Sequence, residues 1–298
     1  MQPLVECVPN FSEGRRPAVI EAIAAAIRAH AAAGIRLLDI ESDADHNRSV
    51  FTVVGPPQAM MEAAFDAIRT AAGLIDLEQH RGAHPRIGAT DVVPFVPLRG
   101  VEMADCVTLA RQLGQRVGEE LQIPVYLYEA AATRPDRVNL ADIRRGEYEG
   151  LKTEIGVNPD RRPDFGPCRL GPAGATVIGA RTFLIAFNVY LTTPDVEIAR
   201  KIAKTVRQSS GGLRYVKALG LSVNGKAQVS MNLTDFEKTP IHVAVELIRR
   251  EAQRYGVTIE SSELVGLIPQ QALLDAAVWY LQLDNFRPNM VLENRLIE

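Results

Sequence analysis

The order of strands and helices repeats within the chain, and this repeat constrains the fold more than any single motif. Apolar periodicity predicts strand, helix, strand, strand, helix and strand, twice in succession. In the first half, the pattern predicts strands at 4–11, 35–40, 50–54 and 92–96, and helices that begin at Pro17 and at residues 55–57. In the second half, it predicts strands at 184–191, 216–223, 228–233 and 263–268, and helices that begin at Thr193 with Pro194 and at Thr239 with Pro240.

Two copies of one βαββαβ order imply two sheets, each covered by helices on one face. The length of 298 residues also agrees with two domains. We therefore predict an α+β protein of two successive ferredoxin-like βαββαβ subdomains, residues 1–180 and 181–298, with stacked mixed sheets and helices on the outer faces. The bare sheet faces are expected to bury each other. Asn224 and Gly225 give the strongest turn signal, a hairpin between 216–223 and 228–233.

Charge and cysteine content exclude several classes of protein. The formal net charge is only −3, and no segment carries the cluster of Lys and Arg that nucleic-acid binding requires. No apolar stretch reaches the ~18 residues of a membrane span, and the N-terminus lacks the pattern of a signal peptide. Cys7, Cys106 and Cys168 are odd in number and widely spaced, which supports neither a disulfide framework nor a zinc site. The expected compartment is the cytoplasm.

The glycine-punctuated loop at 81–91 concentrates candidate catalytic groups, because it places His84 between arginines and near an aspartate. A histidine exchanges protons near neutral pH, and arginines bind carboxylates in a bidentate manner. The alternative is a surface loop with a partly exposed histidine. A metal site made by His80 and His84 is disfavoured, since Gly82 and Pro85 break the helix that their spacing needs.

Polar side chains also interrupt apolar strands, where two-residue alternation places them on a sheet face. For Glu6 and Asp39 the alternatives are catalysis and a solvent-exposed edge. For Asn188 and Asn232 we favour a structural role, in which they satisfy buried backbone groups. Cys7 has no neighbouring base in the sequence that would make it a nucleophile.

Two further segments allow either a binding or a passive role. Residues 164–174 are too rich in Gly and Pro for a helix or a central strand, and form a linker or a binding loop. Asn47 and Arg48 follow a polar turn, where the guanidinium faces a ligand carboxylate or solvent. The chain lacks GxGxxG after a strand, GxxxxGK[ST] and GxSxG, the signatures of nucleotide phosphate binding and serine hydrolysis.

Several long segments carry a resemblance to a known family. They are LVECVPNFSEG at 4–14, HPRIGATDVVPFVP at 84–97, PVYLYEAA at 124–131, DFGP at 164–167 and FLIAFNVYL at 183–191. Over nearly its whole length the chain resembles the glutamate formimidoyltransferase (formiminotransferase) family. Animal members fuse this module to a cyclodeaminase domain, whereas the present chain ends after about the transferase length. We therefore expect a stand-alone bacterial-type transferase without cyclodeaminase activity.

The resemblance implies transfer of the formimino group from N-formimino-L-glutamate to tetrahydrofolate, giving 5-formiminotetrahydrofolate and L-glutamate in histidine degradation. It implies tetrahydrofolate as co-substrate, no metal, a folate-binding tunnel and a homodimer. The family's catalytic histidine falls on His84. The folate-contacting segment falls on Gly166, Pro167, Cys168, Arg169, Leu170, Gly171, Pro172, Ala173 and Gly174. This loop is about one residue shorter than in animal members and lacks their aromatic residue, and Ala83 replaces an acidic residue before the histidine.

Other residues are assigned to the reaction as hypotheses. Asp39 and Asp91 are expected to be catalytic, by orienting the imidazole or polarising the amidine. The residues expected to bind the substrates are Asn10, Asn47, Arg48 and Arg86. Two alternatives stay open: formyl transfer between 5-formyltetrahydrofolate and glutamate, and a non-catalytic module that binds folate or another metabolite.

Overall fold

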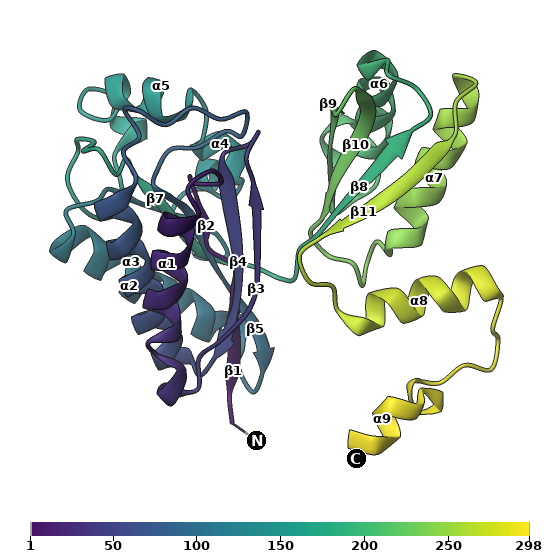
Figure 1. Cartoon of the computed structure of the whole chain (residues 1–298), viewed down its shortest axis with the longest axis horizontal. Helices are drawn as coiled ribbons and strands as arrows, with labels where there is room; N and C mark the ends of the chain where they lie inside the picture. Colours follow the sequence, from purple (N-terminus) through teal and green to yellow (C-terminus); the bar gives the residue numbers. More distant parts are fainter. Residues whose placement is uncertain (1, 298) are drawn as a thin grey trace. The chain divides into compact units, whose positions relative to one another are not determined.

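The computed structural model describes residues 2–297, which divide into two compact units between Thr182 and Phe183 (Figure 1). The first unit contains β1 (Leu4–Cys7), β2 (Asn10–Phe11), α1 (Pro17–Arg28), β3 (Arg36–Asp43), β4 (Arg48–Gly55), α2 (Pro57–Leu74), β5 (Thr90–Arg99), α3 (Met103–Glu120), β6 (Val125–Glu129), α4 (Leu140–Ile143), α5 (Glu147–Glu154) and β7 (Thr176–Ala180). The second contains β8 (Ile185–Leu191), α6 (Val196–Val206), β9 (Val216–Val223), β10 (Lys226–Leu233), α7 (Ile241–Arg254), β11 (Ile259–Val265), α8 (Gln270–Leu281) and α9 (Leu292–Ile297).

The sheet of the first unit is mixed. Strand β3 pairs with β4, and β1 and β2 follow one another between β4 and β5, all in antiparallel pairs. Strands β7 and β6 then extend the sheet in parallel beyond β5. The single strand predicted at 4–11 is wrong in this respect, because the chain leaves the ladder at Val8 and Pro9, and proline cannot donate a ladder hydrogen bond.

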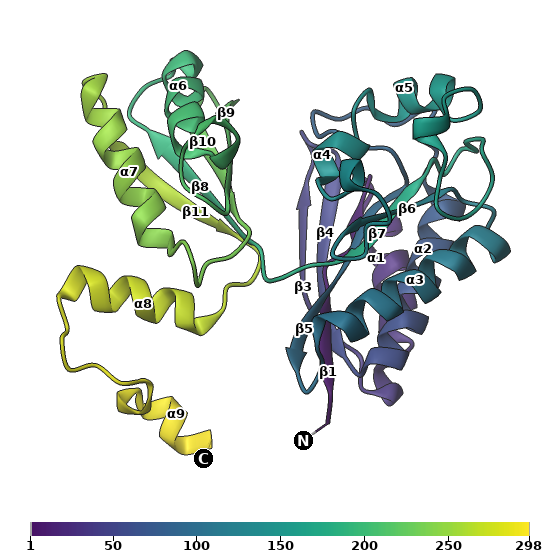
Figure 2. The same ribbon diagram turned by 180° about the vertical axis from the view of Figure 1, so that it is seen from behind.

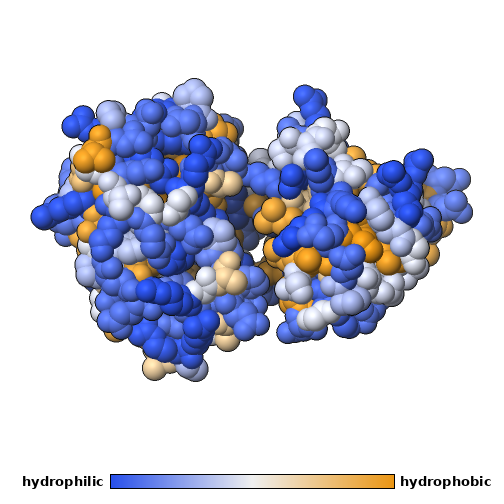
Figure 3. Space-filling model, turned by 90° about the horizontal axis from the view of Figure 1, so that it is seen from above, coloured by the Kyte–Doolittle hydropathy of each residue, from blue (hydrophilic) through white to orange (hydrophobic). Residues whose placement is uncertain are grey.

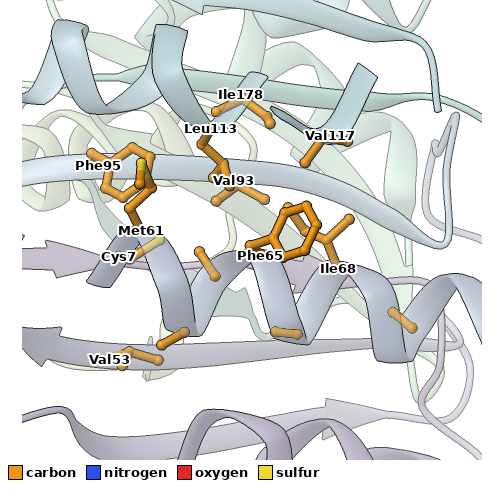
Figure 4. Packing of buried hydrophobic residues seen from close by; sticks show 14 of the residues in the cluster. Cys7, Val53, Met61, Phe65, Ile68, Val93, Phe95, Leu113, Val117 and Ile178 are labelled. Carbon is orange, nitrogen blue, oxygen red and sulfur yellow. The ribbon is translucent and has the colours of Figure 1, made fainter. Parts of the chain in front are cut away.

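Helices α1, α2 and α3 cover one face of this sheet (Figures 1 and 2). On α2, Met61, Phe65 and Ile68 recur at helical spacing and point toward β5, where they meet Val93 and Phe95 (Figure 4). Phe65 is 1% exposed and Phe95 is fully buried. Truncating such a residue to Ala costs about 3–5 kcal/mol. This packing fixes which strand positions face the helices, so the intervening residues project from the opposite face.

The opposite face of the first sheet is partly covered by the segment between β6 and β7. This segment contains α4 and α5, which pack against strand residues that alternate with those of the main core. The buried members of this second apolar cluster are Ile87, Val92, Tyr126, Tyr128, Ile143, Leu151, Ile155, Ala175 and Val177. The cluster anchors α4 and α5 beside the end of β5 that carries the loop at 79–90.

The second unit is more regular. Its sheet has the order β11-β8-β10-β9, and α6 and α7 cover one face. The predicted hairpin is confirmed, with left-handed φ values of 51° at Asn224 and 73° at Gly225. The prediction of a mixed sheet is wrong for this unit, because each of its strand pairs is antiparallel. Figure 3 shows apolar side chains, in orange, at the surface of both units.

Two sequence interpretations of polar strand residues are wrong. Glu6 is only 7% exposed, since β1 lies between β4 and β5, so it does not face solvent from an edge. The asparagines of the second sheet do not satisfy buried backbone groups: Asn232 is exposed, and Asn188 Nδ2 donates to Glu263 Oε2 at 3.0 Å. Within residues 2–297, no helix is both long and apolar enough to cross a membrane.

Candidate functional site

A small pocket opens in the first unit where the β3–β4 turn meets the loop at 79–90. Its lining residues are all polar or charged types, and they come from the end of β2, this turn, the loop and the start of β5. The lining residues are Ser12, His46, Asn47, Arg48, His80, His84, Arg86 and Asp91. The structure thus brings together predicted residues from two separate segments, 47–48 and 84–91, together with others that sequence reasoning had not selected.

Asn47 connects the segments around the pocket. Its backbone is left-handed, with φ 49°, a conformation that asparagine tolerates better than most residues. Its Oδ1 accepts a hydrogen bond from Gly14 N at 3.0 Å, and its Nδ2 donates to Arg81 O at 3.0 Å. The Asn47 carbonyl lies 2.9 Å from His80 Nε2. With both ends of its amide occupied, Asn47 holds the turn and the loop in register.

Arg48 and His84 form the central contact of the pocket. Arg48 Nη1 lies 2.6 Å from His84 Nε2. A guanidinium only donates, so Nε2 is the acceptor and the imidazole carries its proton on Nδ1. Burial, together with the positive charges of Arg48 and Arg144, lowers the pKa of His84 to about 2. The imidazole is therefore neutral at physiological pH.

Arg48 is itself largely removed from solvent. Burial and the nearby Arg144 lower the pKa of Arg48 to about 10, opposed by the carboxylate of Asp91. The guanidinium still remains charged near neutral pH. A charged guanidinium that faces a neutral imidazole is suited to receive an anionic group.

Asp91 supports the pocket from its base. Its Oδ1 accepts a hydrogen bond from Ile87 N at 2.8 Å, and its Oδ2 is paired with the guanidinium of Arg144, at the end of α4. The side chain of Asp91 is 2% exposed. Asp91 therefore fixes the loop that carries His84 and places the positive charge of Arg144 near the imidazole.

The guanidinium of Arg86 is bound to carboxylates of the protein. It donates to Glu147 Oε2 at 2.8 Å and to Glu149 Oε1 at 2.7 Å, both on α5. Its Nε donates to His80 Nδ1 at 3.2 Å. These contacts tie the loop at 79–90 to α5, and substrate binding by Arg86 would require exchange of one of these carboxylates.

Asp39 and Asn10 lie outside the pocket lining. Asp39 is half-buried in the middle of β3, opposite Thr52 of β4, on the sheet face that α1 to α3 leave uncovered. Asn10 lies in β2, where its Nδ2 donates to Val8 O at 3.0 Å. Both remain predictions as functional residues.

The loop at 166–174 is joined to the segment that follows His84. Ala89 N donates to Ala173 O at 2.8 Å, and Ala175 N donates to Ile87 O at 2.9 Å. The residues at 168, 169, 171 and 172 are exposed, whereas the end of the loop at Gly174 is buried. The exposed part of the loop is therefore anchored beside the histidine-bearing loop.

Two glycines allow this junction. Gly88 and Gly174 form an isolated antiparallel bridge. A Cβ at Gly88 would lie 1.9 Å from the carbonyl oxygen of Ala175, and one at Gly174 would lie 2.2 Å from that of Ile87. Gly174 also has a φ of 67°, so both space and backbone conformation require glycine.

Sequence reasoning missed Ser12, His46 and Arg144, and considered His80 only as a metal ligand. Ser12 Oγ donates to Gly88 O at 2.7 Å, and Arg144 pairs with Asp91 from 53 residues away. His46 lies in the polar turn before Asn47, and only its being a histidine could have indicated a functional role. His80 donates from Nε2 to Asn47, and burial lowers its pKa, which keeps the ring neutral.

Two of the three cysteines are poorly placed for nucleophilic chemistry, and Cys168 is an exposed free thiol. Cys7 and Cys106 are buried free thiols. Burial raises the pKa of the Cys7 thiol, and burial with the charge of Asp105 raises that of Cys106 to about 11, so both are weak nucleophiles. Across residues 2–297, no cluster of three or more His, Cys, Asp and Glu side chains is placed to hold a metal ion.

Comparison with known proteins matches the whole chain to one family. The model of the formiminotransferase domain, N-terminal subdomain, matches residues 4–181, and that of the formiminotransferase domain matches residues 186–297. A glutamate formimidoyltransferase of Thermoplasma acidophilum is 52% identical and is aligned over 98% of this chain and 97% of its own length. One from Streptococcus pyogenes serotype M1 is 47% identical over 100% of both chains. The formimidoyltransferase-cyclodeaminase of Rattus norvegicus is 48% identical over 94% of this chain but only 53% of its own length.

Proposed function

The chain belongs to the formiminotransferase family, and from this premise we propose that it transfers the formimino group of N-formimino-L-glutamate to tetrahydrofolate. The products are 5-formiminotetrahydrofolate and L-glutamate, a step of histidine degradation. The observation that carries the proposal is the contact between Arg48 and the neutral imidazole of His84, in a pocket whose loop is joined to residues 166–174.

His84 acts as the base in this reaction. The N5 amine of tetrahydrofolate attacks the formimino carbon, and a tetrahedral intermediate forms as His84 accepts the N5 proton. The intermediate collapses when the bond from carbon to the glutamate nitrogen breaks and that nitrogen receives a proton. General acid–base catalysis of this kind contributes about 10²- to 10⁴-fold. The imidazole of His84 is neutral before substrate binds, because of burial and the charges of Arg48 and Arg144. Movement of Arg48 to the substrate removes one of the charges that oppose proton uptake by His84.

Arg48 binds a substrate carboxylate and thereby releases the base. In the unliganded pocket Arg48 occupies His84 Nε2, the nitrogen that has no proton. A carboxylate is a stronger acceptor for a guanidinium than an imidazole and can bind in a bidentate manner. When Arg48 turns to a glutamyl carboxylate, Nε2 becomes available to accept a proton. Substrate binding thus prepares the catalytic group.

The other predicted residues receive roles that follow their positions. Asp91 orients His84 indirectly, through the backbone of Ile87 and the guanidinium of Arg144. Asn47 positions the turn. Asp39, on the sheet face opposite α1 to α3, remains a catalytic candidate, and Asn10 remains a candidate for substrate binding. Arg86 remains a candidate for carboxylate binding after exchange with Glu147 or Glu149.

Residues 166–174 form the folate-contacting loop of this proposal. Their exposed backbone and their attachment to the segment after His84 support it, because a folate bound there lies beside the base. We extend the proposal to two ferredoxin-like subdomains and a cytoplasmic homodimer. The strand orders, β3-β4-β1-β5 within the first sheet and β11-β8-β10-β9 in the second, support the fold assignment.

A paired turnover assay tests the proposal. Purified protein is given tetrahydrofolate with N-formimino-L-glutamate, and separately 5-formyltetrahydrofolate with glutamate, and wild type is compared with His84→Ala. We expect formimino transfer that falls by at least about 10²-fold in the variant. Activity with the formyl donor alone would assign a folate-salvage reaction. Binding of folate without turnover would assign a non-catalytic module, and full turnover by His84→Ala would refute the catalytic role.

A further inference from the structure

A second histidine faces the same pocket and is held by a carboxylate. The His46 ring lies 6.2 Å from the His84 ring, centroid to centroid, at an interplanar angle of 81°. His46 Nδ1 lies 3.1 Å from Asp43 Oδ2, and the backbone N–H of His46 donates to Asp43 Oδ1 at 2.7 Å. The Asp43 contact occupies Nδ1, and therefore Nε2 is the nitrogen that is left for a ligand.

The turn that carries His46 is fixed to the loop that carries His84. Ala83 N donates to Asp45 O at 3.1 Å, and a Cβ on Gly82 would lie 2.2 Å from the His46 carbonyl oxygen. On its other side, Arg15 Nε donates to Ala44 O at 2.7 Å. The two imidazoles are therefore held at a defined separation before any substrate binds.

The surroundings of the two imidazoles differ in a way that separates an acid from a base. Arg48 and Arg144 disfavour a proton on His84, and a proton on His46 disfavours it further. His46 instead faces a carboxylate, and although burial opposes it, hydrogen bonds from His46 lower the pKa of Asp43. His84 thus contacts a guanidinium, whereas His46 contacts a carboxylate. Two imidazoles with such different neighbours are suited to divide acid and base roles between them.

We propose that His46, oriented by Asp43, is the general acid that protonates the departing glutamate nitrogen. This rests on the proposed function. The N5 proton passes to His84 Nε2, the bond from carbon to the glutamate nitrogen breaks, and that nitrogen takes the proton on His46 Nε2. The proton on His84 then returns to His46, so the enzyme ends the cycle with its original protonation.

The two histidines differ in their access to solvent. His84 is enclosed with Arg48 and Arg144. His46 has a side chain that is 33% exposed, so it can also exchange protons with solvent. The charged or titratable residues around its turn are Arg15, Asp43, Asp45, Arg48, Arg81 and His84.

The test compares His46→Gln with a matched pair elsewhere in the same unit. His30 Nε2 lies 2.9 Å from Asp66 Oδ2, with a side chain that is 22% exposed, and neither residue lines the pocket. In formimino transfer, kcat of His46→Gln is expected to fall by about 10²-fold, and KM to change little. His30→Gln is expected to keep the wild-type kcat. Added imidazole should restore part of the activity of His46→Ala.

Rescue by imidazole separates a catalytic from a structural role. Asp43→Asn keeps the His46 imidazole but removes the carboxylate that orients it, so it should lower kcat less than His46→Gln does. Wild-type kcat in His46→Gln would overturn the inference. So would a lower kcat in His46→Ala that added imidazole does not raise. A wild type that fails to transfer formimino groups would instead refute the proposed function.

Discussion

The two units share one order of strands and helices, yet they differ in what they bury. In the first unit, Arg48, Arg86 and Asp91 are gathered beside His84, around segments that the second unit lacks: the loop at 79–90 and the stretch from β6 to β7. In the second unit the elements follow one another through short connections, and the buried polar side chains described there are Gln228, Thr239, His242 and Glu251. The repeat provides a sheet with helices on one face, and in the first unit the added segments, together with the ends of β4 and β5, form the pocket of the proposed reaction.

One histidine from each unit, His84 and His242, can be compared directly. His84 is half-buried and His242 is buried, and burial lowers the pKa of each. His84 contacts Arg48, whereas His242 stacks on Trp279 with 5.1 Å between ring centroids and 19° between ring planes. Burial alone therefore does not single out the histidine that we propose as catalytic; the neighbouring groups do.

The largest expected effect separates these two histidines. His84→Asn should lower kcat for formimino transfer by about 10²- to 10⁴-fold, because the base is lost. His242→Asn should keep the wild-type kcat and lower thermal stability, because stacking on Trp279 is lost. Steady-state kinetics and melting curves of both variants measure this contrast. Equal losses of kcat would show that both units contribute directly to the chemistry.

The next effect compares two glycines with left-handed backbones. Gly174→Ala should cost about 3 kcal/mol or more, because strain at φ 67° adds to the clash with the Ile87 carbonyl. Gly225→Ala should cost only about 1–2 kcal/mol, since φ is 73° but nothing lies within 4 Å of the new Cβ. Urea unfolding of both variants measures the difference. Equal costs would contradict the tight junction between the two loops.

A smaller effect tests the buried carboxyl of the first sheet. Burial, opposed by the charge of Arg181, raises the pKa of Glu6 from 4.5 to about 7. Since the folded pKa is the higher one, the stability that the protonated form contributes is present below pH 4.5 and is lost as the pH rises through 7. Glu6→Gln should therefore gain on the order of 3 kcal/mol relative to wild type between pH 4.5 and pH 8.

Thermal melts of Glu6→Gln at several pH values measure this gain. Glu263→Gln is the control in the second unit, where the carboxylate lies exposed on β11 and accepts from Asn188 and Tyr190. It should show little pH-dependent difference from wild type. If Glu6→Gln behaved in the same way, the carboxyl of Glu6 would have to be solvated in the folded protein.

The smallest expected effects should be the same in the two units. Lys152 pairs with Glu78 in the first unit and Lys226 with Glu260 in the second, with lysine side chains 47% and 49% exposed. Exposed ion pairs contribute about 0–1 kcal/mol. Lys152→Met and Lys226→Met should therefore each change the unfolding free energy by less than about 1 kcal/mol and leave kcat unchanged. A large loss from only one of them would extend the difference between the units to their surfaces.

The parts of the fold that were predicted correctly have strong local signals. The hairpin at Asn224 and Gly225 combined two-residue alternation with a defined turn, and proline at the start of α1 and α2 marked where these helices begin. Helices α4 and α5, of 4 and 8 residues, are too short to develop an apolar stripe, so the sequence could not reveal them. The break at Pro9 was missed because the residues around it have high strand propensity.

The site was predictable only where its residues lie close together in the chain. His84, Arg86 and Asp91 belong to one loop, and their composition indicated proton transfer near charged groups. The carboxylates that bind Arg86 come from 61 and 63 residues away. No local pattern predicts such contacts, because they depend on how α5 packs. His46 was overlooked because a polar turn explains a histidine without any function.

The bridge between Gly88 and Gly174 has a consequence for how the two substrates assemble on the enzyme. It joins the glycine-rich loop to the backbone leading back to His84, with hydrogen bonds from Ala89 and Ala175 on either side. A co-substrate that orders the loop therefore also restricts the pocket. Equilibrium coupling is reciprocal. A ligand in the pocket therefore changes the affinity of the loop for the co-substrate by the same factor. The two ligands should bind cooperatively, with an affinity for each that depends on the concentration of the other.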